Sequence, residues 1–298
     1  MRLRLQRIFV APIGAVAVAS IMVFATQVPS ETPLELVRQT AQNEIKSANS
    51  ETKVAFLDRK ETLHGTQTKL VVETYDVTVG MLVAVNDKPL APQQRQAEEA
   101  RLEGLAHNPE ELRRKRKSEK KDDEYTTRIM KALPDAFLYE PDGAVPGLQG
   151  VGRAGDPLVR LKFRPNPRYS PPSHVEQVLA GMQGYILIDA EKHRIARIDG
   201  TLIKDVSFGW GVLGHLDKGG HFLVEQGDVG NGHWDVTRMD LAFTGRELLF
   251  RSINIKSEES FSNFRFVPSN LTFAQGVELL KKREAELADN QLQPPKPD

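Results

Sequence analysis

Histidine and aspartate side chains gather in one stretch of the sequence and could together hold a metal ion. The stretch contains His215, Asp217, His221, Asp228 and His233. Three of these residues sit in turns beside glycines, and the ends of hairpins cluster in space. None of the tight spacings of metal sites occurs, neither histidines one turn apart on a helix nor histidines flanking one strand residue. The sequence therefore predicts no metal ligand and no cofactor, and a metal-dependent enzyme is the least favoured function.

A glycine motif of the dinucleotide-binding type spans residues 150–155. That motif needs a following helix whose N-terminus meets a pyrophosphate, whereas here Asp156-Pro157 and a strand pattern follow. A loop is the better interpretation. The sequence also lacks a Gly-x-Ser-x-Gly elbow, a phosphate loop and any cysteine, which excludes thiol catalysis and disulfides. We therefore predict no catalytic residue and a protein that is not an enzyme.

The strongest run of charge is Arg113, Arg114, Lys115, Arg116 and Lys117. A solvated helix face is the simplest interpretation, and contact with an anionic membrane surface or a protein partner is the functional alternative. No aromatic side chain interleaves the run for base stacking, so nucleic acid is not expected as a partner. The whole chain has 40 basic and 40 acidic residues, which also argues against a general polyanion binder.

Apolar side chains recur along the second half of the chain and could either fill a core or line a cavity. In the first interpretation they pack between a sheet and its helices. In the second, a curved sheet with few covering helices leaves part of its concave face open, and such a face binds acyl chains or apolar segments. The candidates for the cavity lining are Val159, Leu161, Phe163, Phe208, Trp210, Phe222 and Trp234.

The elements that would position these residues are mostly strands. A helix is expected to start at Thr32-Pro33, where a capping box precedes an apolar stripe, and a last helix covers 272–288. The short turns between successive strands, one of them at Thr244-Gly245, indicate an antiparallel meander. Strands are expected at 52–64, 68–86, 158–163, 184–190, 195–210, 220–227, 233–244, 246–257 and 259–267.

The predicted fold class is α+β, mainly β. It is a half-open antiparallel β-barrel, that is a curved meander sheet, with amphipathic helices over its concave face. One domain covers residues 31–290 and contains a charged helical hairpin at 91–133. The hairpin has no apolar residue between Arg113 and Glu124, so this length of helix is expected to project into solvent. Residues 291–298 form a proline-rich tail that is expected to be disordered.

Residues 1–30 have the layout of a secretory signal. Arg2, Arg4 and Arg7 precede an uncharged stretch rich in Ala, Val and Ile that closes on small residues. The stretch is also long enough for an uncleaved inner-membrane anchor. In both cases the body is exported, and the periplasm or cell envelope is the expected location. Without the three arginines the 40 basic residues become 37, against 40 acidic ones.

Several short motifs carry a resemblance to a known family. After a signal, an amphipathic helix and a two-strand start come the turn Asn86-Asp87-Lys88-Pro89-Leu90 and a charged helical hairpin. Four segments follow them: Gly184-Tyr185-Ile186-Leu187-Ile188-Asp189, Val206-Ser207-Phe208-Gly209-Trp210, Lys218-Gly219-Gly220-His221-Phe222 and Glu225-Gln226. Together they resemble the outer-membrane lipoprotein-sorting-like proteins of bacterial envelopes, relatives of the periplasmic lipoprotein carriers of the Lol system. The resemblance covers roughly residues 32–267. It implies a half-open barrel with helices in its mouth, where the carriers hold acyl chains. The long charged insert and the C-terminal helix depart from the family pattern.

Two functions follow as hypotheses. The first is an exported envelope protein that binds a lipid, an acylated protein or an apolar segment in its concavity, in lipoprotein or lipid trafficking. The alternative is an envelope scaffold or regulatory module whose cavity is plugged by its own helices. The sequence predicts neither the identity of the ligand nor an oligomeric state.

Overall fold

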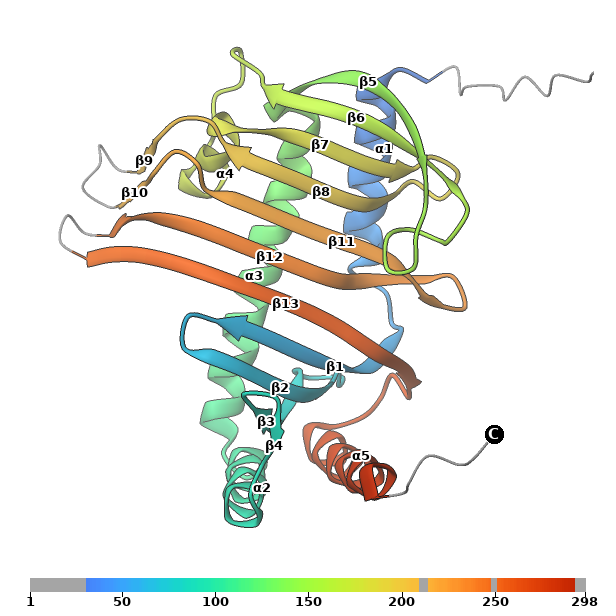
Figure 1. Ribbon diagram of the computed structural model, residues 1–298, viewed down its shortest axis with the longest axis vertical. Coiled ribbons are helices and arrows are strands. Elements are labelled where there is room, and N and C mark those ends of the chain that lie inside the picture. The colour runs from blue at the N-terminus through green and yellow to red at the C-terminus, as the bar shows by residue number, and fades with distance from the viewer. Residues whose placement is uncertain (1–30, 209–213, 248–250, 293–298) are drawn as a thin grey trace, which may run out of the picture. The chain divides into compact units, whose positions relative to one another are not determined.

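The computed structural model describes residues 31–208, 214–247 and 251–292 (Figure 1). The predicted signal or anchor at 1–30 and most of the predicted tail therefore lie outside the described residues. From Thr32 onward, the described residues form one compact unit. In these three ranges no helix combines the length and the apolar character that a membrane crossing needs.

A single antiparallel sheet dominates the described residues and contains 13 strands (Figure 1). Its order is β4-β3-β2-β1-β13-β12-β11-β8-β7-β6-β5, while β10 pairs with β12 and β9 pairs with β10. Because β4 and β5 end this order without pairing to each other, the sheet stays open and no barrel closes. The prediction of an α+β, mainly β fold with a half-open antiparallel sheet is confirmed. The strands are β1 (Lys53–Thr62), β2 (Gly65–Val72), β3 (Val79–Val85), β4 (Lys88–Pro89), β5 (Phe137–Pro146), β6 (Pro157–Pro165), β7 (Met182–Asp189), β8 (Arg194–Leu202), β9 (Val206–Phe208), β10 (Gly214–Leu216), β11 (His221–Gly230), β12 (His233–Glu247) and β13 (Arg251–Val267).

Some strand boundaries differ from the prediction. The predicted reversal at Thr244-Gly245 is wrong, because β12 continues to Glu247 and the two strands expected after it are one strand, β13. Gly245 lies inside β12 where β10 pairs beside it, and a Cβ atom there would come 2.0 Å from the backbone oxygen of His215. This glycine permits a close approach of two backbones and does not form a turn. The strand expected at 195–210 is divided into β8 and β9.

Two helices, α1 (Pro33–Ser47) and α3 (Pro109–Ala136), pack on one side of the sheet, which we call the helix face (Figure 1). The predicted start of α1 is confirmed: the Thr32 hydroxyl accepts a hydrogen bond from the Glu35 backbone, and the Glu35 carboxylate accepts one from the Thr32 backbone. Buried side chains of both helices and of β5 to β8 form the first core, including Val37, Leu133 and Ile186. A short helix, α4 (His174–Gln177), and a 3-10 turn, η1 (Val178–Gly181), adjoin it.

The charged hairpin takes part in two cores and does not stand away from the body. Its first helix, α2 (Pro92–Ala106), packs with α5 (Phe273–Leu292) on strands β1 to β3, where Leu102 is buried. Its second helix is α3, which passes along the helix face to reach β5 (Figure 1). We expected the part of α3 without apolar residues to project into solvent, and this is wrong for the side of the helix that faces the body. There Arg116 pairs with Asp76 at 2.6 Å, and Glu119 accepts a hydrogen bond from the Thr78 backbone. Polar contacts replace the missing apolar ones there.

Candidate functional site

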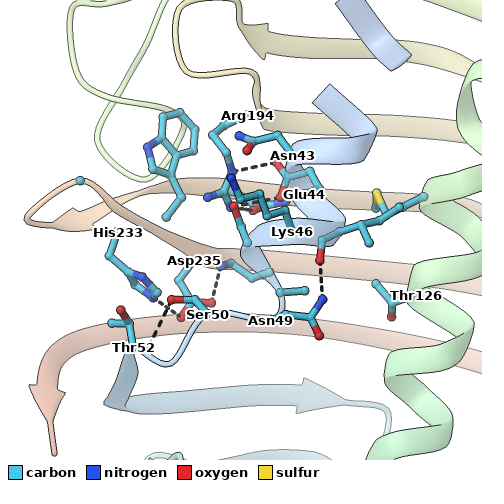
Figure 2. Close-up of a pocket in the computed structure, with 18 of the residues that line it drawn as sticks. Asn43, Glu44, Lys46, Asn49, Ser50, Thr52, Thr126, Arg194, His233 and Asp235 are labelled. Atoms are coloured by element: carbon cyan, nitrogen blue, oxygen red, sulfur yellow. Dashed lines mark hydrogen bonds and ion pairs between the residues drawn. The ribbon is translucent and has the colours of Figure 1, made fainter. Parts of the chain in front are cut away.

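A cavity of about 920 Å³ lies between the C-terminal end of α1, the middle of α3 and the turn that joins β11 to β12 (Figure 2). Most of the residues that line it have polar or charged side chains, and they come from α1, from the sheet and from the segments between them. The apolar side chains that line it are those of Ile45, Ala48, Met130, Trp234 and Val236. A cavity of this kind suits the polar part of a ligand better than an acyl chain alone.

A buried ion pair forms one wall of this cavity and fixes the end of α1 to the sheet. The Arg194 guanidinium donates to both carboxylate oxygens of Glu44, at 3.0 and 3.1 Å, and the Ile195 backbone N–H donates to the same carboxylate at 2.7 Å. The guanidinium also lies 5.7 Å from the centre of the Trp234 ring, a cation-π distance. The side chains of Glu44 and Arg194 are only 8% and 12% exposed, so the pair is held in a desolvated position.

Two further carboxylates and one imidazole line the cavity. Burial raises the pKa of Asp235. Burial also raises the pKa of Glu73, and the negative charge of Asp235 raises it further. Burial lowers the pKa of His233, whose Nε2 lies 3.8 Å from the Asp235 carboxylate. These groups offer hydrogen-bond donors and acceptors to a polar ligand. In the part of the chain that the structure describes, no three His, Asp or Glu side chains come together as metal ligands.

An apolar surface occupies the middle of the helix face, on β11, β12, β13 and β1, which α3 crosses on its way from the segment before β3 to β5 (Figure 1). Strand register places it: Phe222 and Val224 of β11 lie opposite Gly200 and Ile198, and Ile198 belongs to the first core. Residues paired with them in β12, and then in β13 and β1, have side chains on the same side of the sheet. We call this surface the open face; it consists of Phe56, Phe222, Val224, Met239, Leu241, Phe243, Ile255, Phe261, Phe264 and Phe266.

The side chains of the open face are only half-buried. Ile255 is 46% exposed and Phe266 is 43% exposed, whereas Leu161 in the covered part of the same side is 1% exposed. The other members are intermediate in exposure. An apolar surface that remains partly accessible on a folded chain is typical of a binding surface.

One charged cluster interrupts the open face. Asp58 of β1 lies opposite Phe261, and Glu259 lies opposite Lys60. Lys60 donates to the Glu259 carboxylate at 3.0 Å. Burial and then the charge of Glu259 raise the pKa of Asp58 to about 6, while Lys69 and Lys60 oppose the shift. The folded protein therefore holds a proton on Asp58 at a pH where the unfolded chain does not.

Because Asp58 binds this proton in the folded state, we expect the effect of Asp58→Asn on stability to depend on pH. The pKa of Asp58 is raised on folding, so the free energy of unfolding falls as the pH rises from about 4 through about 6. We expect Asp58→Asn to be more stable than the wild type at pH 8, by about 1 kcal/mol after allowing for partial exposure, and equal to it at pH 4. Urea denaturation at both values measures this. Asp87→Asn is the control: Arg59 lowers the pKa of Asp87, so its substitution should cost stability at pH 8.

The residues predicted to line a cavity are placed in different surroundings. Leu161 and Phe163 are buried in the first core, and Val159 and Phe222 pack against it. Trp234 is buried in a separate cluster with Val151 and Leu158, and it also lines the cavity. Trp210 and the side chain of Phe208 lie outside the described residues. The sequence analysis did not identify Met239 and Leu241 of the open face, although the alternation of apolar and polar residues along β12 could have indicated them. It also did not identify the Glu44–Arg194 pair.

The predicted metal candidates do not converge. His215 lies near Asp205 and Asp217, His221 pairs with Asp199, and His233 lies near Asp235. Asp228 pairs with Arg153 of the glycine motif. That motif is a loop between β5 and β6 and no helix follows it, as the sequence predicts.

The basic run lies in α3 and is divided between two sides of the helix. Arg116 and Lys115 take part in ion pairs with Asp76 and Glu119. Arg113 pairs with Glu110 of its own helix. Arg114 and Lys117 are exposed and have no acidic partner within the described residues.

The comparisons with known proteins find only distant structural similarity. No family model matches the sequence, and no curated protein matches it. The crystal structure of an outer membrane lipoprotein-sorting protein domain from Vibrio parahaemolyticus aligns with a TM-score of 0.32 and 9% identity, over 83% of this chain and 99% of that one. A DUF1329 family protein from Desulfovibrio piger aligns with a TM-score of 0.28 and 10% identity, over 84% and 100%. Since both TM-scores are below 0.5, neither protein assigns a function to this chain.

Proposed function

We propose that this chain is an exported envelope protein that binds an amphiphile, a lipid or an acylated protein, with its acyl chain on the open face. The half-buried state of the open face carries the proposal. An acyl chain lying there would remove apolar surface from water on both molecules, which is worth about 0.8 kcal/mol per methylene. The polar cavity at the edge of the same sheet side supports a polar headgroup as the second part of the ligand.

The plugged scaffold is the second candidate. In its favour, α1 and α3 fill the helix face over β5 to β8. Against it, α5 packs with α2 on a different core, so it leaves the open face uncovered. The open face therefore favours binding over a fully plugged sheet.

A substitution at the edge of the open face tests the proposal. Ile255→Asp places a carboxylate beside a bound acyl chain, and because Ile255 is 46% exposed the fold should tolerate it. We expect delipidated protein to bind a fluorescent fatty acid saturably and this variant to bind it at least about tenfold more weakly, since burying an unpaired carboxylate is costly.

The matched control is Leu148→Asp, which changes an apolar side chain that is 60% exposed in the loop between β5 and β6. It should leave binding unchanged. Absence of saturable binding by the wild type, or equal weakening by both variants, would contradict the proposal and favour the plugged scaffold.

A further inference from the structure

The outer side of α3 carries a row of cationic side chains for which no ion pair with a strand of the described sheet is found. Seven of the nine residues from 113 to 121 are Arg or Lys. At 3.6 residues per turn, Leu112, Glu119 and Met130 fall on one side of the helix. That is the inner side, because Leu112 packs in the second core, Glu119 bonds the Thr78 backbone and Met130 lines the cavity. Among the cations of the run, Arg114, Lys117 and Lys121 fall on the opposite side, while Arg113 and Lys120 fall between the two sides.

Ion pairs account for only part of this charge. Lys115 and Arg116 are engaged by Glu119 and Asp76. The other five form the stripe: Arg113, Arg114, Lys117, Lys120 and Lys121. Of these, Arg113 has an acidic partner, Glu110, and the rest have none among the described residues. The stripe therefore carries unneutralised positive charge over a length of about 12 Å.

An aromatic side chain continues the stripe. Tyr125 follows Lys121 by one helical turn, its side chain is 37% exposed, and the Lys121 ammonium lies 5.4 Å from its ring centre. A tyrosine beside cations suits the boundary between water and lipid headgroups, where the ring enters the interface and the cations meet phosphates.

The orientation of the stripe is fixed by contacts at both ends of the helix. Arg116 and Glu119 hold its first half to the segment before β3, and Arg128 donates to the Glu176 carboxylate of α4 at 2.8 Å. A fixed orientation removes much of the ordering cost of contact with a surface.

We propose that the stripe and Tyr125 dock this protein on an anionic lipid bilayer. Charge complementarity selects this partner over nucleic acid. The 40 basic residues of the chain include Arg2, Arg4 and Arg7, so 37 remain after residue 30 against 40 acidic ones, which disfavours a polyanion that surrounds the protein. A flat anionic surface contacts only one face of the protein. At physiological ionic strength, acidic side chains farther than about 8 Å from that surface are screened from it, so they do not oppose the contact. The docking requires no ligand on the open face, so it does not depend on the proposed function.

The test uses the full chain, so that its apolar N-terminal stretch contributes equally in every comparison. Vesicles of phosphatidylcholine, with and without phosphatidylglycerol, are sedimented with the wild type and with the triple variant Arg114→Glu, Lys117→Glu, Lys120→Glu. We expect the wild type to prefer the anionic vesicles, and the triple variant to lose about a hundredfold of that preference. High salt should remove the wild-type preference as well.

The matched control is Lys218→Glu, Lys256→Glu, Lys282→Glu, which makes the same charge change at exposed lysines outside α3. It should keep most of the preference for anionic vesicles. Equal loss in both triple variants, or no preference by the wild type, would overturn the proposal. Tighter binding of the wild type to a DNA duplex than to anionic vesicles at the same salt would also overturn it. Circular dichroism confirms that the helices remain in each variant.

Discussion

Replacement of Glu44 by alanine is expected to destabilise the fold by about 4 kcal/mol. The substitution leaves the Arg194 guanidinium, 12% exposed, without its carboxylate and leaves the Ile195 backbone N–H without its acceptor. A buried cation without a partner cannot regain its hydration, which makes removal of one partner of a buried pair costly. Urea denaturation should show a lower midpoint at an unchanged slope.

Two comparisons separate the buried charge from a general weakening of α1. Arg38 is also in α1, and its exposed ion pair with Asp135 of α3 has a distance of 3.8 Å. Arg38→Ala breaks this pair and should lower the free energy of unfolding by less than about 1 kcal/mol. Combining Glu44→Leu with Arg194→Met replaces both charges by apolar groups and should restore part of the loss. A loss from Glu44→Ala no larger than that from Arg38→Ala would show that the pair is not desolvated in solution.

Replacement of Gly184 by alanine is the second large effect, a loss of about 3 kcal/mol. Gly184 lies opposite Gly200 in the β7–β8 pair, and a Cβ atom there would come 1.8 Å from the Asp199 backbone oxygen. That oxygen belongs to the neighbouring strand and cannot move without disturbing the pairing. The sheet must separate locally or lose hydrogen bonds.

The control for Gly184 is a glycine with free space around it. A Cβ atom at Gly104 in α2 meets nothing within 4 Å. Gly104→Ala should stabilise the protein by about 0.5 to 1 kcal/mol, because alanine is the better helix former. Thermal unfolding of the two variants should therefore shift in opposite directions, and a Gly184→Ala variant as stable as the wild type would be incompatible with the close approach of β7 and β8.

Much of the fold was predictable because it depends on local signals. The capping box at Thr32 and Glu35 predicts the start of α1, and it is present. Alternation and short turns predict an antiparallel meander, which the sheet order bears out. The error at Gly245 has a physical cause: a glycine needed for a turn and one needed for close backbone approach look identical in sequence.

The candidate site was less predictable because it is made by long-range contacts. Leu161 and Ile255 are both aliphatic residues on strands, yet one is 1% and the other 46% exposed. The difference depends on which part of the sheet α1 and α3 pack against, and no local pattern encodes that. Similarly, Glu44 and Arg194 are 150 residues apart, and neither is distinctive in its own segment.

Local patterns along the chain were enough to predict the fold class, the start of α1, the loop nature of the glycine motif and the concentration of positive charge at 113–117. These depend on side-chain periodicity, capping and composition, which act over a few residues. The three-dimensional arrangement was needed to see which apolar residues remain half-exposed, which cations of α3 lie on its outer side, and that a buried ion pair fixes the end of α1 to the sheet. Burial and charge pairing are properties of neighbours in space, and the order of strands and the path of α3 set those neighbours.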